Sequence, residues 1–193
     1  PAGIISAVKK NSVLDHLFMG VSLMGVSMPV FWAALLFQYI FAYKLGWFPV
    51  SGTNGWTSYV LPSIVLGWSS AGTIARLTRS NLLETLEDDY IRTAWAKGLG
   101  QSGVIVRHAF KNALLPVITM MAIQVASLLS GAVITESVFA IPGVGRLAVD
   151  AISSRDMPLL QGTVVFTTIL IILGNLLADV LYSVIDPRIR TDH

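Results

Sequence analysis

The feature that most constrains the fold is a set of long stretches with almost no Asp, Glu, Lys or Arg. A helix of about 20 apolar residues crosses the hydrocarbon core of a bilayer, and a charge inside it is costly. These stretches predict four membrane spans, at about residues 17–43, 58–77, 112–135 and 157–183, the last with one acid, Asp179, near its inner end. Composition agrees, because 54% of the residues are hydrophobic and 12% are charged. The sequence therefore predicts an all-α polytopic membrane protein.

The Lys and Arg residues are divided unequally between the two sides of these spans. Of the 13 such residues in the chain, the smaller group consists of Lys44, Arg146 and Arg155. Cytoplasmic loops are enriched in Lys and Arg, so both termini and the loop of residues 78–111 are expected in the cytoplasm. The net charge of +2 then reflects topology, and the clustered basic and aromatic surface of a nucleic-acid binder is not found.

The chain begins at Pro1 rather than Met, and residues 1–8 have the composition of the end of another apolar helix. We expect residues 1–193 to be one transmembrane domain that belongs to a longer protein.

The cytoplasmic loop at residues 78–111 contains a short amphipathic pattern, which predicts a helix at residues 89–99. Acidic residues at its start and Lys97 near its end suit the helix dipole, and Gly98 or Gly100 can supply the left-handed terminating residue. Such a helix can dock on a partner protein, or it can lie flat on the lipid surface. Its apolar residues recur at helical spacing: Ile91, Ala94, Trp95 and Leu99.

Several segments resemble a known family. Residues 89–99 (DYIRTAWAKGL) and 107–116 (RHAFKNALLP) are similar to the cytoplasmic signature loop of binding-protein-dependent ABC transporter permeases, in the dipeptide/oligopeptide/nickel branch. The broad permease pattern is Glu-Ala-Ala, three residues, Gly, then a distal Leu-Pro. Here Arg92 and Thr93 replace the Glu and the first Ala. Ala94 and Gly98 match, and the Leu-Pro at residues 115–116 comes about five residues late. The other similar segments are 136–146 (ESVFAIPGVGR), 155–158 (RDMP) with Gln161, and 186–190 (DPRIR).

The resemblance implies the fold of a type I ABC importer permease, in which residues 89–99 form the coupling helix that sits in a cleft of a cytoplasmic ATPase subunit. Small side chains would allow close backbone approach, while Trp95 and Leu99 would anchor the contact and Arg92 would lie at its rim. The residues assigned to this contact are Asp89, Tyr90, Arg92, Ala94, Trp95, Ala96, Lys97, Gly98 and Leu99.

On the outer side, residues 136–156 are polar and contain turn-forming proline and glycine residues, which predicts a re-entrant or surface loop. The resemblance implies that this loop lies near the outer gate and the docking surface of a substrate-binding protein. An ordinary connecting loop is the alternative. The residues assigned to the gate are Glu136, Phe139, Pro142, Gly143, Gly145 and Arg146.

Polar residues inside the predicted spans include Gln38, Gln124 and Asn175. They either hydrogen-bond neighbouring helices, which we favour, or line a water-filled path. Small residues at four-residue spacing in the second span predict a close helix contact, for which a second permease is a candidate partner. These are Gly67, Ala71 and Ala75.

The resemblance implies a permease subunit of an ATP-driven importer in the cytoplasmic (inner) membrane of a prokaryote, which moves di- or oligopeptides or a related small solute. Its partners would be a second permease subunit, two cytoplasmic ATPase subunits, an extracytoplasmic substrate-binding protein and membrane lipid. Residues before Pro1 would supply two more spans and an outer domain. The chain contains no GxxxxGK[ST] motif, so ATP and Mg²⁺ are expected on the partner ATPases and no cofactor on this chain.

Two other classes of function remain as alternatives to this one. A stand-alone channel or an ion-driven secondary carrier would need no ATPase. The coupling-type loop and the lack of a charged residue deep in a span count against it. An enzyme is not expected either, because the sequence assembles no nucleophile, base or metal site. The three histidines, His16, His108 and His193, lie at span edges or in a tail.

Overall fold

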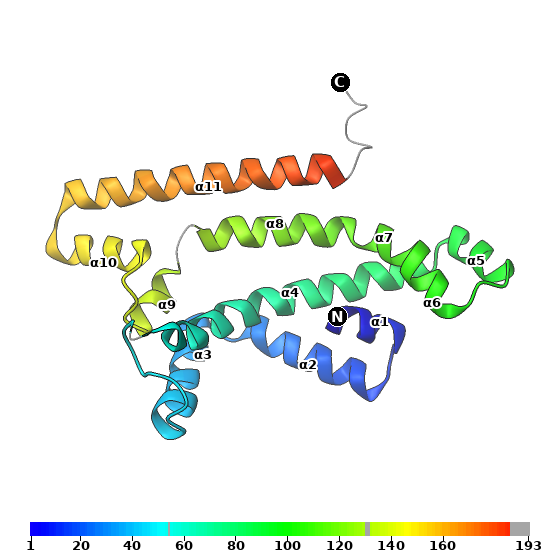
Figure 1. Ribbon diagram of the computed structural model, residues 1–193, viewed down its shortest axis with the longest axis horizontal. Coiled ribbons are helices and arrows are strands. Elements are labelled where there is room, and N and C mark those ends of the chain that lie inside the picture. The colour runs from blue at the N-terminus through cyan, green and yellow to red at the C-terminus, as the bar shows by residue number, and fades with distance from the viewer. Residues whose placement is uncertain (54, 130–131, 186–193) are drawn as a thin grey trace.

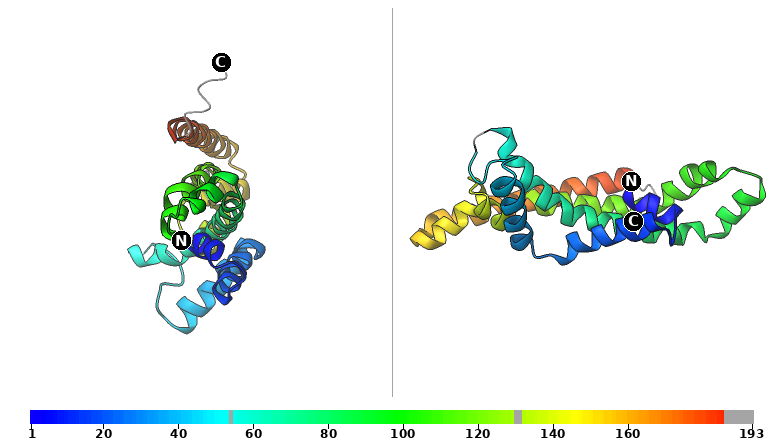
Figure 2. Two further views of the ribbon diagram at one scale, coloured as in Figure 1. Left: turned by 90° about the vertical axis from the view of Figure 1, so that its right-hand side faces the viewer. Right: turned by 90° about the horizontal axis from the view of Figure 1, so that it is seen from below.

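The computed structural model describes residues 1–53, 55–129 and 132–185. Within these residues every regular element is a helix, so the predicted all-α class is confirmed. The helices form an elongated bundle (Figures 1 and 2). Its elements are α1 (Ala2–Val8), α2 (Val13–Ser27), α3 (Val30–Phe37), η1 (Gln38–Lys44), η2 (Trp56–Tyr59), α4 (Val60–Leu86), α5 (Asp89–Ala96), α6 (Gln101–Gly103), η3 (Val104–Ala109), α7 (Phe110–Ala113), α8 (Leu115–Leu129), α9 (Val133–Val138), α10 (Val144–Ser154) and α11 (Met157–Ile185).

Helix α4 is the centre of the bundle. Helices α1 and α2 pack on one side of it and α8 packs on another, while α11 packs on α8. Helices α5 and α6 lie at one end of the long axis, and α3, α9 and α10 lie at the opposite end (Figure 1). The two segments that the sequence singled out, the amphipathic helix and the outer loop, are therefore at opposite ends of the molecule.

Small residues let α2 and α4 approach closely. A Cβ on Gly72 would lie 2.5 Å from the carbonyl oxygen of Ser22, and one on Gly25 would lie 2.6 Å from Trp68. The indole Nε1 of Trp68 donates a hydrogen bond of 3.0 Å to the carbonyl oxygen of Val21. Gly67, in the predicted small-residue stripe, lies at no such contact within the described chain, because a Cβ there would meet nothing within 4 Å.

The first predicted span is two helices rather than one. Helix α2 and the segment Val30–Lys44 meet at an angle of 109°. Pro29 lies at the break, and Met28 before it is extended, with ψ of 130°. Proline lacks the backbone N–H that would continue the helix, and it disfavours helical geometry in the residue before it.

The third predicted span is also bent. Val104–Ala113 and Leu115–Val125 meet at 50°. Pro116 occupies the first turn of α8, where its missing N–H costs least, so the chain can start a new helix there but cannot continue the previous one.

Within the described residues, Met157–Leu177 of α11 is long and apolar enough to cross a membrane alone. Counting each bent pair as one span raises the number to three. The second predicted span, at 58–77, falls in α4, which is outside this set. Arg76 and several Ser and Thr residues reduce the hydropathy of α4. The division into four spans therefore stays a prediction.

The connection predicted at residues 78–111 is largely helical. Helix α4 continues to Leu86, α5 follows at Asp89–Ala96, and helix resumes again at Gln101. The continuation is held by packing, because Leu82 of α4 is fully buried in a cluster with Ile91 and Val104. The charged residues of α4 mark the end of the apolar sequence but not the end of the helix. Outside the membrane, a helix can continue as long as one of its faces is buried.

Candidate functional site

The amphipathic helix predicted at residues 89–99 is present as α5, Asp89–Ala96. The chain then turns at Gly98, which has φ of +76° and whose N–H donates a 2.9 Å hydrogen bond to the carbonyl oxygen of Trp95. A left-handed glycine after the last turn is a common helix terminator. Of the two glycines proposed as terminator, Gly98 takes this role, since Gly100 has φ of −67°.

One face of α5 packs against the rest of the chain. Ile91 and Ala94 are buried in a cluster with Leu82 of α4 and with Val104 and Ala109 of η3. This part of the apolar face, which lipid adsorption would need, is therefore used inside the protein. The packing ties α5 mainly to η3, and the shared cluster reaches the end of α4 through Leu82.

At the edges of this buried face, and just after α5, large side chains are exposed. Tyr90, Trp95 and Leu99 are between 41% and 43% exposed. The four apolar residues that recur at helical spacing thus divide into an inward pair and an outward pair. Tyr90 is held in place, because its hydroxyl accepts a 2.8 Å hydrogen bond from Nδ2 of Asn112. A cavity of about 300 Å³ lies beside it, lined by Tyr90, Thr93, Ala94, Lys97, Leu99 and His108.

The charged residues assigned to coupling lie in solvent around this surface. Arg92 makes an exposed ion pair of 3.5 Å with Asp89, one turn earlier in α5. An exposed pair of this kind contributes little to stability, so both groups remain free to bind another protein. Ala96 and Lys97 are exposed as well. We define the coupling surface as the exposed side chains Tyr90, Arg92, Trp95, Ala96, Lys97 and Leu99.

At the other end of the bundle, Glu136 is the residue around which the gate segment is built. Its carboxylate accepts hydrogen bonds from the N–H groups of Arg146, at 2.9 Å, and Ala132, at 3.3 Å. The Arg146 N–H belongs to the first turn of α10, so the negative charge lies at the positive end of that helix. A Cβ on Gly143 would overlap the carboxylate of Glu136, and one on Gly145 would lie 2.9 Å from Oε2.

The segment 136–156 is mostly helical. It consists of the end of α9, a turn, and α10. Phe139 in the turn is 2% exposed and packs in a cluster with Ala34, Leu61 and Val65. Its carbonyl oxygen also accepts a 2.9 Å hydrogen bond from the N–H of Gly52.

A glutamine inside the first predicted span makes a further connection on this side. Nε2 of Gln38 donates to the carbonyl oxygens of Val50, at 2.7 Å, and Val138, at 3.2 Å. Gln38 therefore hydrogen-bonds neighbouring segments of the chain, which is the alternative favoured from the sequence over lining a water-filled path. Pro142 and Arg146 line a cavity of about 680 Å³ with Thr53 and Asp150.

The contact between Gly143 and Glu136 gives a stability prediction. Gly143→Ala should lower the stability of the purified protein by about 1–3 kcal/mol, because the new methyl group displaces the carboxylate from the start of α10. Thermal unfolding measures this change. Gly162→Ala is the matched control, since a Cβ at Gly162 meets nothing within 4 Å. In the double variant Gly143→Ala with Glu136→Ala the overlap is removed, so its loss of stability should be smaller than the sum of the two single losses. If the two losses simply added, the overlap would not be the cause.

One interaction was not predicted. The carboxylate of Asp15, which is 1% exposed, binds Arg79 through two hydrogen bonds, Nε to Oδ1 at 2.7 Å and Nη2 to Oδ2 at 2.8 Å. The N–H of Asn11 donates to Oδ2 at 2.9 Å. In the sequence, the signal was an acid just before the first predicted span and a base just after the second. This ion pair joins α2 to α4.

The described helices include candidate membrane spans, as expected of a polytopic membrane protein. Over residues 1–191 the sequence matches the family described as binding-protein-dependent transport system inner membrane component, and the chain belongs to this family.

Relatives with described functions are similar over almost the whole chain. It is 46% identical to the dipeptide transport system permease protein DppB of Alkalihalophilus pseudofirmus and 42% identical to the di/tripeptide transport system permease protein DppB of Pseudomonas aeruginosa, over 98% of this chain and 65% of each relative. It is 43% identical to the glutathione transport system permease protein GsiC of Escherichia coli, over 98% of this chain and 62% of the relative. The chain thus spans just under two thirds of the length of these relatives.

Proposed function

We propose that this chain is part of a membrane-spanning permease subunit of an ATP-driven importer, which forms the path for di- or oligopeptides or for glutathione. Membership of the family of inner membrane transport components supports this function. The relatives named above supply the two candidate solutes. Binding and hydrolysis of ATP would take place on partner subunits.

The observation that carries the coupling part of the proposal is the two-sided packing of α5. Its inner side is buried against α4 and η3, and its outer side exposes the coupling surface. An aromatic and aliphatic group with a charged rim is typical of a protein contact in which a few anchors supply most of the binding energy. The coupling surface would dock on a cytoplasmic ATPase subunit.

Movement of the ATPase would then reach the membrane helices through α4. Closure of an ATP-bound dimer of two ATPase subunits would displace α5, and the buried cluster would pass this displacement to the end of α4. The helices would switch between inward-facing and outward-facing arrangements. ATP can drive this switch only because it favours one arrangement over the other.

The proposal places α5 and both ends of the chain in the cytoplasm and α10 on the outer side of the inner membrane. The cavity lined by Pro142 and Arg146 then faces the compartment in which an extracytoplasmic substrate-binding protein would deliver the solute. A second permease subunit would complete the path, and the open surface at Gly67 of α4 offers a place for close helix packing.

Co-purification and uptake test this function. The full-length protein, extracted in mild detergent, should retain a P-loop ATPase, a second permease and, with solute, a binding protein, all identifiable by mass spectrometry. Proteoliposomes of the assembly should take up radiolabelled dialanine or glutathione only with ATP. If the chain were stable alone and moved either solute without ATP, it would be a channel or an ion-driven carrier.

A further inference from the structure

Between α2 and α8, helix α4 presents a polar stripe to the outside of the described chain. Ser69, Thr73, Arg76 and Ser80 are spaced at i, i+4, i+7 and i+11, which places them on one side of the helix. The neighbouring sides of α4 are covered, because Gly72 lies against Ser22 of α2 and the Ser70 hydroxyl lies 3.5 Å from Oε1 of Gln124 of α8. The polar stripe is therefore the side of α4 that α2 and α8 leave uncovered.

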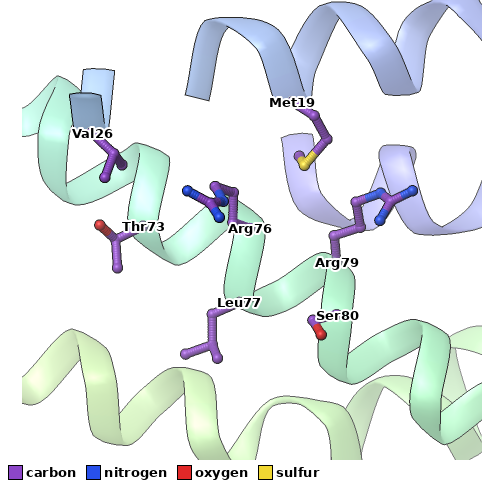
Figure 3. A pocket seen from close by; sticks show the side chains of 7 residues that line it. All are labelled: Met19, Val26, Thr73, Arg76, Leu77, Arg79 and Ser80. Atoms are coloured by element: carbon purple, nitrogen blue, oxygen red, sulfur yellow. The ribbon is translucent and has the colours of Figure 1, made fainter. Parts of the chain in front are cut away.

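A cavity of about 440 Å³ lies along this stripe (Figure 3). Helix α4 provides Thr73, Arg76, Leu77, Arg79 and Ser80, and α2 provides Met19 and Val26.

The two arginines of the cavity differ in their partners. Arg79 is neutralised, because it binds the buried carboxylate of Asp15 through two hydrogen bonds. Arg76 is exposed and, among the described residues, makes neither an ion pair nor a side-chain hydrogen bond. The cavity therefore has one uncompensated positive charge, surrounded by hydroxyl groups and apolar side chains. Arginine binds carboxylate oxygens with charge and a planar fork of donors.

We propose that this cavity is a binding site on the transport path for the carboxylate of the solute, with Arg76 as its cation. The proposal rests on the function proposed above, in which the solute is a peptide or glutathione and so carries a carboxylate. The Thr73 hydroxyl donates a 3.2 Å hydrogen bond to the carbonyl oxygen of Ser69, so the arginine is the group that needs a polar partner. A charged side chain within a membrane span nearly always faces the bundle interior or a water-filled cavity. The lipid headgroup phosphate is the other oxyanion that could reach Arg76, and the experiments below separate the two.

Thiol labelling tests whether the stripe is wet and positive. The chain contains no cysteine, so Thr73→Cys introduces one reporter. In the assembled transporter in phosphatidylcholine nanodiscs, it should react with the anionic reagent methanethiosulfonate ethylsulfonate, monitored by the mass of this subunit. The rate relative to a cationic methanethiosulfonate should fall several-fold when Arg76→Gln is added. Ala71→Cys, at the same depth on another side of α4, should not show this dependence. Equal behaviour at both positions would overturn the proposal.

Uptake tests whether the site serves the solute. Arg76→Gln should reduce ATP-driven uptake of dialanine or glutathione about tenfold, the expected effect of losing one charge-assisted contact, while Arg76→Lys should retain part of the uptake. Co-purification of the partner subunits checks that both variants still assemble, so that a loss of uptake is not a loss of assembly. Unchanged uptake in Arg76→Gln would overturn the site but leave the transport function standing, whereas absence of uptake in the unaltered protein would overturn the function itself.

The lipid composition separates the two oxyanions. The effect of Arg76→Gln should be the same in pure phosphatidylcholine and in mixtures with phosphatidylglycerol. An effect that appeared only with phosphatidylglycerol would identify Arg76 as a lipid contact and overturn its role on the path.

Discussion

Arg79→Leu is expected to reduce the free energy of unfolding by about 3–5 kcal/mol, because it leaves the carboxylate of Asp15 buried without its cation. Asp15 is 1% exposed, and the Asn11 N–H would be its remaining hydrogen-bond donor. The reverse change, Asp15→Leu, should cost less. The Arg79 side chain is 26% exposed and long enough to extend its guanidinium toward water.

The double change Asp15→Leu with Arg79→Leu should be less destabilising than Arg79→Leu alone, since two apolar side chains of suitable size can replace a buried ion pair at little cost. Thermal unfolding of the four proteins in one detergent measures the coupling between the two sites. The expected order of stability is the unaltered protein, the double variant or Asp15→Leu, and last Arg79→Leu. If Arg79→Leu were as stable as Asp15→Leu, the pair would not be buried as described.

The sequence predicted the helical class correctly but not the extent of each helix. Apolar run length reports where lipid can surround a helix, and it placed the end of the second span at residue 77. Helix α4 continues for two further turns to Leu86 because Leu82 packs against residues of α5 and η3. These residues belong to other elements and meet Leu82 only in the folded chain. Proline at position 29 was a visible signal for the break in the first span, although not for the angle of 109°.

The amphipathic helix was predictable, and so was its termination at one of two glycines, Gly98 or Gly100, because spacing and glycine are local signals. Which apolar residues are buried was not predictable. Ile91 and Trp95 are both apolar and one turn apart, and only the position of α4 and η3 decides that the first is buried and the second exposed.

The outer segment shows the same limit of sequence reasoning. Gly143 and Gly145 were read as turn residues, whereas both also make room for the carboxylate of Glu136. That carboxylate lies at the start of α10 because α9 and α10 pack against each other, and no local sequence pattern predicts this contact.

Gly98→Trp is expected to abolish solute uptake while leaving ATP hydrolysis by the partner subunits, in the coupling model proposed for α5. A Cβ at Gly98 meets nothing within 4 Å in this chain, so an indole there would project outward from the coupling surface instead of into the core. It would keep the ATPase from seating against Trp95 and Leu99. Uptake and ATP hydrolysis, measured together in proteoliposomes of the full assembly, give the coupling ratio.

Gly98→Ala separates bulk from backbone strain. Because φ at Gly98 is +76°, any other residue is strained there, by about 1–2 kcal/mol for a left-handed conformation. Alanine carries this strain without the bulk, so it should retain most uptake, and both variants should fold and keep the cluster around Ile91. Ala94 is a poor site for the same test, since it is buried and a large residue there would disrupt α5 itself. Normal uptake by Gly98→Trp would mean that the ATPase does not dock on the coupling surface.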